Sequence, residues 1–255
     1  KKVVREHIGD AQTVIAEELS HVIDDIKIIQ ESSDQKSNTK ITYIQNSVLL
    51  ELPKMASNTI NGVITSPPYC NRYDYTRTYA LELVYLGIDD NGIKKMRQDL
   101  LSCTVESKSK LEKLKKYYEE IGCIDRFNEI QNTIQNNNVF KEVMGALHAR
   151  KENGDLNNNG VIRMVEGYFT ELAFIYAELY RICTKGAKVV FVNDNVRYGG
   201  EVIPVDFLSS LFAEQFGFKI EKIYCLKQRK GNSSQQMAKY GKVPLRKSLT
   251  IWVKE

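Results

Sequence analysis

The chain has 255 residues, of which 42% are hydrophobic and 9% aromatic, a composition typical of one sizeable globular domain with room for an insertion. Its net charge of +4 is mild, and the absence of any apolar run near 18 residues excludes a membrane span. Five scattered cysteines without a CxxC pair, only three histidines and a polar start at residues 1–10 predict a cytoplasmic protein without disulfides, metal site or secretory leader.

The N-terminal region is expected to open with a helix. Ile15, Leu19, Val22 and Ile26 recur at the i, i+4, i+7, i+11 spacing of one buried helical face. A polar loop over residues 31–39 separates this helix from a short strand predicted at residues 41–44. Asn46 follows that strand, and a short helix is expected over residues 48–52.

A double-proline segment stands at the centre of the chain. Val63, Ile64 and Thr65 form a short apolar run that predicts a buried strand, and Ser66-Pro67-Pro68-Tyr69 follows directly. The two prolines fix successive φ angles and remove two backbone donors, so the loop is stiff and its carbonyls are left free. Such a loop suits recognition of an amino group. In open α/β sheets ligands lie beyond the carboxyl ends of strands, which is where this loop begins.

The residues after the loop combine aromatic and charged side chains. Arg72, Tyr75 and Arg77 are candidates for contact with a nucleic-acid backbone, and Asp74 would orient one of the two arginines. The alternative is an Arg–Asp pair that only stiffens the loop. A helix is expected from Thr78, with its apolar positions 81, 84 and 85 turned inward.

The block from Lys94 to Asn159 is helical in pattern and interrupts the α/β order. Residues 94–118 hold eight basic and three acidic side chains, and residues 219–247 hold nine basic and one acidic. Clustered positive charge is the footprint of a phosphate-backbone binder, although a solvated helix face explains the first cluster equally well. We interpret the block as an insertion for target recognition, with a structural cap as the alternative.

The C-terminal part carries the clearest elements. A helix is predicted over residues 165–183 with Lys185-Gly186 as its C-cap, then a core strand over residues 188–192 with Asn193-Asp194-Asn195 at its carboxyl end. Gly199-Gly200 predicts a turn, and a helix follows over residues 204–216. Strands at residues 218–226 and 245–253 flank a basic loop. The donors of that loop that suit phosphates or base edges are Arg229, Lys230, Asn232, Ser233 and Gln235.

Thr65 to Tyr69 (TSPPY) resembles the catalytic motif of prokaryotic methyltransferases that act on exocyclic amino groups of DNA bases. The residues after the motif, the run 191–198 and the segment 230–237 are similar to one branch of this family, so that the resemblance covers residues 41–254. It implies an α/β fold with a Rossmann-like methyltransferase sheet, a C-terminal antiparallel hairpin and a helical insertion. It also implies transfer of a methyl group from S-adenosylmethionine to DNA in a restriction–modification system. The Ser form preceded by Thr looks most like the N4-cytosine enzymes, with N6-adenine as the alternative.

The resemblance gives each motif residue a role. Ser66 and the Pro67 carbonyl would accept the N–H groups of the target amine and so localise its lone pair, which is catalysis by preorganised acceptors. Pro68 stiffens the loop, and Tyr69 would stack on a base flipped out of double-stranded DNA, a contact worth about 1–3 kcal/mol. The residues expected near the cofactor are Asn46, Thr65, Asn193 and Asp194.

One part of the expected pattern is missing. The family needs a Gly-rich loop after its first strand to hold S-adenosylmethionine, and no such segment occurs in the 255 residues. We therefore expect a sheet that is incomplete on its N-terminal side, with the cofactor half upstream or on a second chain. The expected organisation is residues 1–90 with the catalytic loop, 91–160 as the insertion and 161–255 as the C-terminal part. A non-catalytic DNA-binding subunit, or methylation of RNA or of a protein amide, are the competing hypotheses.

Overall fold

The computed structural model describes residues 10–32, 40–227, 237–241 and 243–255, and the chain divides into two compact units, Lys1–Gln45 and Asn46–Glu255. In the first unit, α1 (Ala11–Ser32) confirms the predicted N-terminal helix but not its buried face, because Ile15, Leu19, Val22 and Ile26 are all exposed. It begins after Asp10, whose carboxylate accepts the backbone N–H groups of Gln12 and Thr13 at 3.0 and 3.1 Å. These bonds satisfy two of the donors that a helix start leaves free.

The strand predicted at residues 41–44 is wrong, because residues 40–45 carry no regular secondary structure. The alternation of Ile, Thr, Tyr and Ile has high β-propensity. A strand also needs a neighbour to take its backbone hydrogen bonds, and within its own unit this segment has none among the described residues.

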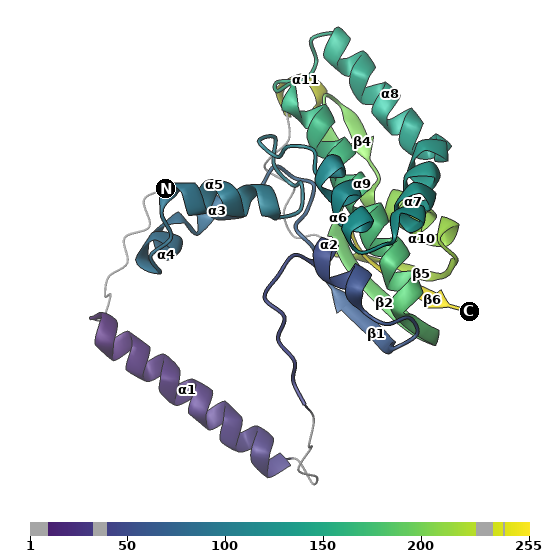
Figure 1. Ribbon diagram of the computed structural model, residues 1–255. Coiled ribbons are helices and arrows are strands. Elements are labelled where there is room, and N and C mark those ends of the chain that lie inside the picture. Colours follow the sequence, from purple (N-terminus) through teal and green to yellow (C-terminus); the bar gives the residue numbers. More distant parts are fainter. Residues whose placement is uncertain (1–9, 33–39, 228–236, 242) are drawn as a thin grey trace. The chain divides into compact units, whose positions relative to one another are not determined.

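The second unit is built on a mixed four-stranded sheet, which confirms the α/β class (Figure 1). The strand order is β1 (Ile60–Thr65), β2 (Cys183–Asp194), β6 (Lys247–Lys254) and β5 (Phe218–Leu226). β1 runs parallel to β2, whereas β2–β6 and β6–β5 are antiparallel. The expected antiparallel pairing of the two C-terminal strands is thus confirmed.

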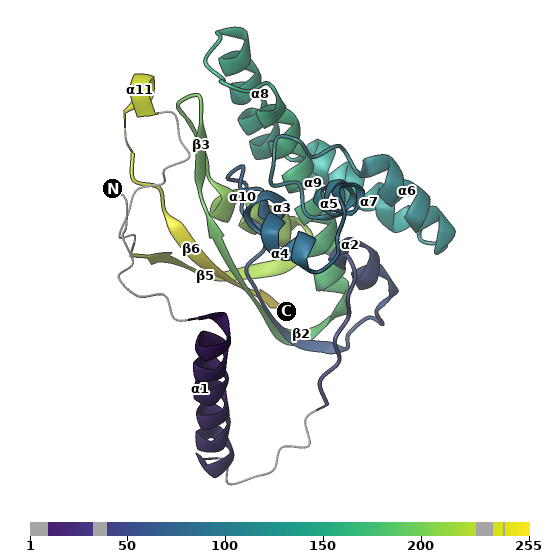
Figure 2. The ribbon, with the colours of Figure 1, turned by 90° about the vertical axis from the view of Figure 1, so that its left-hand side faces the viewer.

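Two helices, α9 (Gly160–Ile182) and α10 (Val205–Gln215), lie against the same face of this sheet (Figure 2). Trp252 of β6, which is fully buried, contacts both: its ring lies 5.0 Å from that of Tyr176 in α9, and its Nε1 donates to Ser210 Oγ in α10 at 3.1 Å. Alternate residues of β2 and β6 are buried under these helices, as period-2 side-chain alternation requires.

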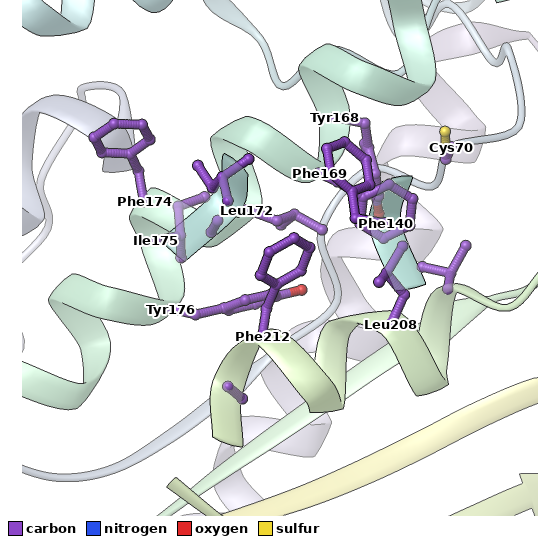
Figure 3. Packing of buried hydrophobic residues seen from close by; sticks show 14 of the residues in the cluster. Cys70, Phe140, Tyr168, Phe169, Leu172, Phe174, Ile175, Tyr176, Leu208 and Phe212 are labelled. Carbon is purple, nitrogen blue, oxygen red and sulfur yellow. The ribbon is translucent and has the colours of Figure 1, made fainter. Parts of the chain in front are cut away.

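Further helices enlarge this core. Residues of α6, α7 and α8 join α9 in one hydrophobic cluster, to which Phe140, Phe169 and Phe212 contribute edge-on ring contacts (Figure 3). The remaining elements before α9 are α2 (Val48–Glu51), η1 (Leu52–Lys54), α3 (Tyr75–Thr78), α4 (Ala80–Tyr85), α5 (Asp90–Asp99), α6 (Leu111–Glu120), α7 (Ile124–Asn136) and α8 (Asn138–Glu152). Those after β2 are β3 (Val196–Tyr198), β4 (Glu201–Ile203) and α11 (Met237–Tyr240).

Two local predictions need correction. Helix α9 ends at Ile182 rather than at Lys185-Gly186, and Gly186 lies in β2 with a φ of +82°, where glycine avoids a Cβ clash. Leu81, Val84 and Tyr85 do not face inward: they are 81%, 58% and 87% exposed, because no other described element packs on that face of the short helix α4.

Residues 91–160 are mostly helical, as expected, but α6, α7 and α8 pack into the same core as the sheet. The division of the chain at residues 90 and 160 therefore stays a prediction. Among the described helices, none combines the length and the apolar character that a bilayer crossing demands.

Candidate active site

The double-proline loop leaves the sheet where β1 ends. Thr65 pairs with Phe191 of the parallel strand β2, so the loop and Asn193–Asn195 emerge at the same edge of the sheet. Ser66 is exposed, and its Oγ lies 3.0 Å from the Tyr69 hydroxyl oxygen. In the described part of the chain, no donor bonds to the Pro67 carbonyl. The loop therefore has an exposed Ser66 hydroxyl and, among the described residues, a Pro67 carbonyl without a donor, and its role as an amine-binding site stays a prediction.

A lysine lies over the aromatic ring of this loop. Lys247, the first residue of β6, places its Nζ 5.2 Å from the centre of the Tyr69 ring. A hydrogen bond with Tyr69 raises the pKa of Lys247, and the nearby charge of Asp194 acts in the same direction. Asp194 is the register partner of Lys247 on β2. Burial raises the pKa of Asp194, partly offset by Lys247, and its Oδ1 is buried without a hydrogen-bond partner among the described residues.

The backbone after Tyr69 is hydrogen-bonded by a residue far away in the sequence. The Tyr198 hydroxyl, from β3, donates to the Cys70 carbonyl at 2.5 Å, and both side chains are buried. Tyr198 also stands beside the Gly199-Gly200 turn, where φ values of +55° and +90° require glycine-like backbone freedom. The β3–β4 hairpin thus anchors the double-proline loop to the segment that follows β2.

The three residues predicted to contact DNA next to the loop have partners in the free chain. Arg72, in the left-handed region at φ +66°, donates from Nη1 to Asn157 Oδ1 at 3.1 Å. Arg77 pairs with Glu106 and, at 3.3 Å, with Asp74. The ring of Tyr75 lies edge-on to that of Tyr73 at 4.9 Å, and burial raises the pKa of Tyr75.

The four residues expected near a cofactor are not brought into one cluster. Thr65 lies directly beside Ser66, and Asp194 faces Lys247. Asn193 instead uses its amide to donate to the Tyr168 hydroxyl at 2.8 Å in the core. Asn46 accepts the Ser47 backbone N–H at 2.8 Å and donates to Glu51, so its side chain is used locally at the start of α2.

An apolar pocket of about 560 Å³ adjoins the loop. It is lined on the sheet side by Ile60, Val63, Ile64 and Thr65 of β1, Phe191 of β2 and the first three residues of the loop, Ser66, Pro67 and Pro68. The other lining residues are Leu172, Ile175, Leu179 and Ile182 of α9, together with Val48, Leu52, Met55 and Leu101. With mostly aliphatic walls, it is suited to apolar side chains or to the face of a ring rather than to a charged group.

Part of the expected site cannot be placed. Arg229, Lys230, Asn232, Ser233 and Gln235 lie outside the described residues. The described chain resumes at α11, where Arg197 donates to the Tyr240 carbonyl at 2.9 Å. Arg246, directly before β6, pairs with Asp206 at 2.7 Å. Hydrogen bonds from Arg246 and Ser248 outweigh the effect of burial and lower the pKa of Asp206.

Sequence reasoning missed Lys247 and the hydroxyl of Tyr198. Tyr198 lies in the run 191–198 that carries the resemblance, but nothing local indicates that it reaches Cys70, 128 positions away. Lys247 becomes visible as a site residue only when the β2–β6 register is known. Arg97, the second partner of Asp74 at 2.9 Å, gave no signal beyond its place in a basic cluster.

Comparison with known proteins identifies homologues that are Type II DNA methyltransferases. The chain is 59% identical over 231 residues to the Type II methyltransferase M.BsoBI of Geobacillus stearothermophilus, covering 91% of this chain and 45% of that protein. It is 42% identical over 236 residues to M.AvaI of Nostoc sp., covering 89% of this chain and 47% of that protein. The chain therefore spans slightly less than half the length of these curated relatives.

Two other comparisons add little. No family model matches the chain. A crystal structure of a candidate DNA modification methylase from Thermus thermophilus aligns with 36% of this chain and 39% of its own, at 18% identity and a TM-score of 0.28, which carries no argument about the fold.

Proposed function

We propose that this chain is the catalytic and target-binding part of an S-adenosylmethionine-dependent DNA methyltransferase that modifies N4 of cytosine in a restriction–modification system. The observation that carries the proposal is the Ser66–Tyr69 loop, with its exposed Ser66 hydroxyl and, within the described residues, unoccupied Pro67 carbonyl at the carboxyl end of β1, in a chain 59% identical over 231 residues to a Type II methyltransferase. On this proposal the sheet is the larger part of a Rossmann-like methyltransferase sheet.

The loop would act through its acceptors. An exocyclic amine is a poor nucleophile because its lone pair is delocalised into the ring. Ser66 Oγ, released from the Tyr69 hydroxyl 3.0 Å away, and the Pro67 carbonyl would accept its two N–H groups and localise that lone pair. The target atom is out of reach inside a duplex, so the base is flipped, and the Tyr69 ring provides the stacking surface once Lys247 moves aside.

S-adenosylmethionine would supply the methyl group, and the described residues fit only part of a site for it. Asp194 Oδ1, buried and unpaired within the described chain, suits a cationic group such as the ammonium of an amino acid, and Thr65 lies beside the acceptor loop. Asn46 and Asn193 are engaged elsewhere. We infer that the remaining contacts come from a Gly-rich half supplied by another segment or a second chain.

DNA would lie across the basic surface around the loop. Arg72, Tyr75 and Arg77 are proposed to contact it, and Arg77, with a side chain 66% exposed, can exchange its ion pair with Glu106 for a phosphate. The basic residues Arg229 and Lys230 and the amides and hydroxyls of Asn232, Ser233 and Gln235 are proposed to contact backbone or base edges.

The test is a methyl-transfer assay followed by nucleoside analysis. Duplex DNA incubated with the protein and labelled S-adenosylmethionine should yield N4-methyldeoxycytidine. N6-methyldeoxyadenosine in its place would reassign the base, since some N6-adenine enzymes share the Ser form of the motif. Salt-sensitive DNA binding without transfer, even after addition of the complementary half, would favour a non-catalytic subunit.

A further inference from the structure

Strand β1 is unlike the other strands of its sheet. Parallel strands are normally covered on both faces and lie inside a sheet. β1 is parallel to β2, yet it is an edge strand within the described residues, and none of its six residues is buried. It includes three β-branched aliphatic residues, and Ile64 is 86% exposed. Half of the residues of β1 are thus typical of an interior strand, although β1 lies at an edge.

The face of the sheet turned away from α9 and α10 is also apolar. Ile64 pairs with Val190, and Val190 pairs with Ile251, so that these three side chains point to this face. Val192 and Leu249 form the next pair on the same face, and all four residues of β2 and β6 are half-buried. No helix of the described Asn46–Glu255 unit lies on this face in Figure 2.

The 560 Å³ pocket opens beside the same strand. It lies between β1 and α9, on the covered side of the sheet, and its walls are mostly aliphatic. A further strand placed next to β1 would direct alternate side chains into this pocket and toward the uncovered face. The free edge of β1, the uncovered face of the sheet and the pocket therefore adjoin one another along this strand. We call them together the β1 surface, which consists of Ile60–Thr65, Val190, Val192, Leu249, Ile251 and the pocket lining.

We propose that the β1 surface is the docking site for the half of the methyltransferase that the curated relatives possess outside the matched region. That half supplies the strand that pairs with β1, fills the pocket and covers the open face. The length argues for this occupant, since the matched region accounts for only 45% and 47% of those proteins. That the occupant also holds S-adenosylmethionine rests on the proposed function, whereas the docking itself does not.

The experiment measures binding without DNA or cofactor. The segment of the Geobacillus relative outside the matched region is expressed separately and titrated into the 255-residue chain by calorimetry. Ile64→Asp should weaken the complex by about tenfold or more, because it would bury a carboxylate in an apolar contact. Leu81→Asp is the matched control: Leu81 is 81% exposed on α4, away from the β1 surface, and its replacement should leave the affinity unchanged.

Hydrogen exchange on the unmodified chain provides a second measurement, which does not depend on whether a substituted variant folds. Backbone amides at the free edge of β1 should exchange quickly in the chain alone and become protected in the complex. The proposal is overturned if the parent chain does not bind the segment, if both variants bind alike, or if these amides are already protected in the chain alone, as residues 1–45 or a second copy would cause. Binding without methyl transfer would retain the docking surface and reject only the proposed activity.

Discussion

The two edges of the sheet are built differently. β5, at one edge, carries Lys219, Glu221 and Lys222 and has a register shift against β6 between Ile220 and Lys222. Charges are a usual protection of an exposed edge, whereas irregular pairing occurs at both edges, because β1 also shifts register against β2 between Ile60 and Gly62. β1, at the other edge, contains no charged residue between Ile60 and Thr65. One edge is protected against further pairing, and the other has the chemistry of a strand that pairs.

The same core supports both edge strands, although only one of them leads into the double-proline loop. Both edges are held by β2 and β6, whose buried residues pack under α9 and α10. The double-proline loop belongs to the unprotected edge, since it begins where β1 ends. The position of Ser66 therefore depends on a strand that has a hydrogen-bonded neighbour on one side only within the described residues.

The largest effect is expected from a change that damages both edges together. Trp252→Ala removes a fully buried ring that contacts Tyr176, Phe191 and Phe218. The free energy of unfolding should fall by about 3–5 kcal/mol, measured by urea denaturation. Tyr224→Ala, on the protected edge and 44% exposed, should cost roughly 0.5 kcal/mol. Equal decreases in the free energy of unfolding for the two variants would mean that Trp252 does not stabilise the sheet more than a residue of one edge strand does.

A change at the loop should separate chemistry from DNA binding. Ser66→Ala removes one of the two proposed acceptors and should lower methyl transfer by about 10²–10³-fold, with DNA binding retained. Ser66→Asn restores an acceptor oxygen and should recover part of the activity. An Ala variant as active as the parent in the transfer assay would remove Ser66 from the proposed mechanism.

Removal of two of the three charges on β5 should make the two edges more alike. Glu221→Val together with Lys222→Val deletes the 2.8 Å ion pair between Lys188 and Glu221 and leaves Lys219 as the one charged residue of this strand. Edge-to-edge association should then gain roughly 0.2–1 kcal/mol for each new cross-strand pair. Sedimentation velocity over a concentration series would detect it. A variant that remains as monodisperse as the parent would show that these charges do not protect the edge.

The smallest effect concerns Asp194, at the end of β2 between the two edges. Burial raises its pKa in the folded chain, so its protonated form is favoured by folding. The stabilisation is complete below the unfolded pKa of about 3.9 and is lost as the pH rises through the higher folded value. Asp194→Asn should therefore raise Tm slightly at pH 7 and leave it unchanged near pH 3. Asp25→Asn, on α1, serves as the control in the same thermal scans.

Local pattern was sufficient where one segment decides its own structure. The apolar face around Phe169, Leu172 and Tyr176 predicted α9 to within a few residues at its ends, and the run at residues 188–192 predicted the centre of β2. The strand before the proline loop followed from Val63, Ile64 and Thr65, and Pro67 and Pro68 predicted the loop at its end; the expected burial of that strand was wrong, since no residue of β1 is buried. What these features share is that their signal lies within about ten consecutive residues.

Pairing between distant segments could not be predicted in this way. Residues 41–44 have strand composition without a strand neighbour, and residues 81–85 have an amphipathic pattern that nothing described in the chain covers. Lys247 reaches Tyr69 only because β6 inserts between β2 and β5 in one particular register. In each case the prediction failed because it required knowing which distant segment packs or pairs against the residue, and that depends on the arrangement of the whole sheet.

The distribution of thiols has a practical consequence for chemical labelling. Cys70 and Cys183 are fully buried, and burial raises the pKa of both; it also raises that of Cys103 to about 11. Cys225, on the protected edge, is the exposed member of the five. Because the thiolate is the reactive form, a maleimide dye should attach first at Cys225. The native sequence thus allows a fluorophore to be attached at a single site on β5. Energy transfer from this site could report the binding of a partner at β1, the other edge strand of the sheet.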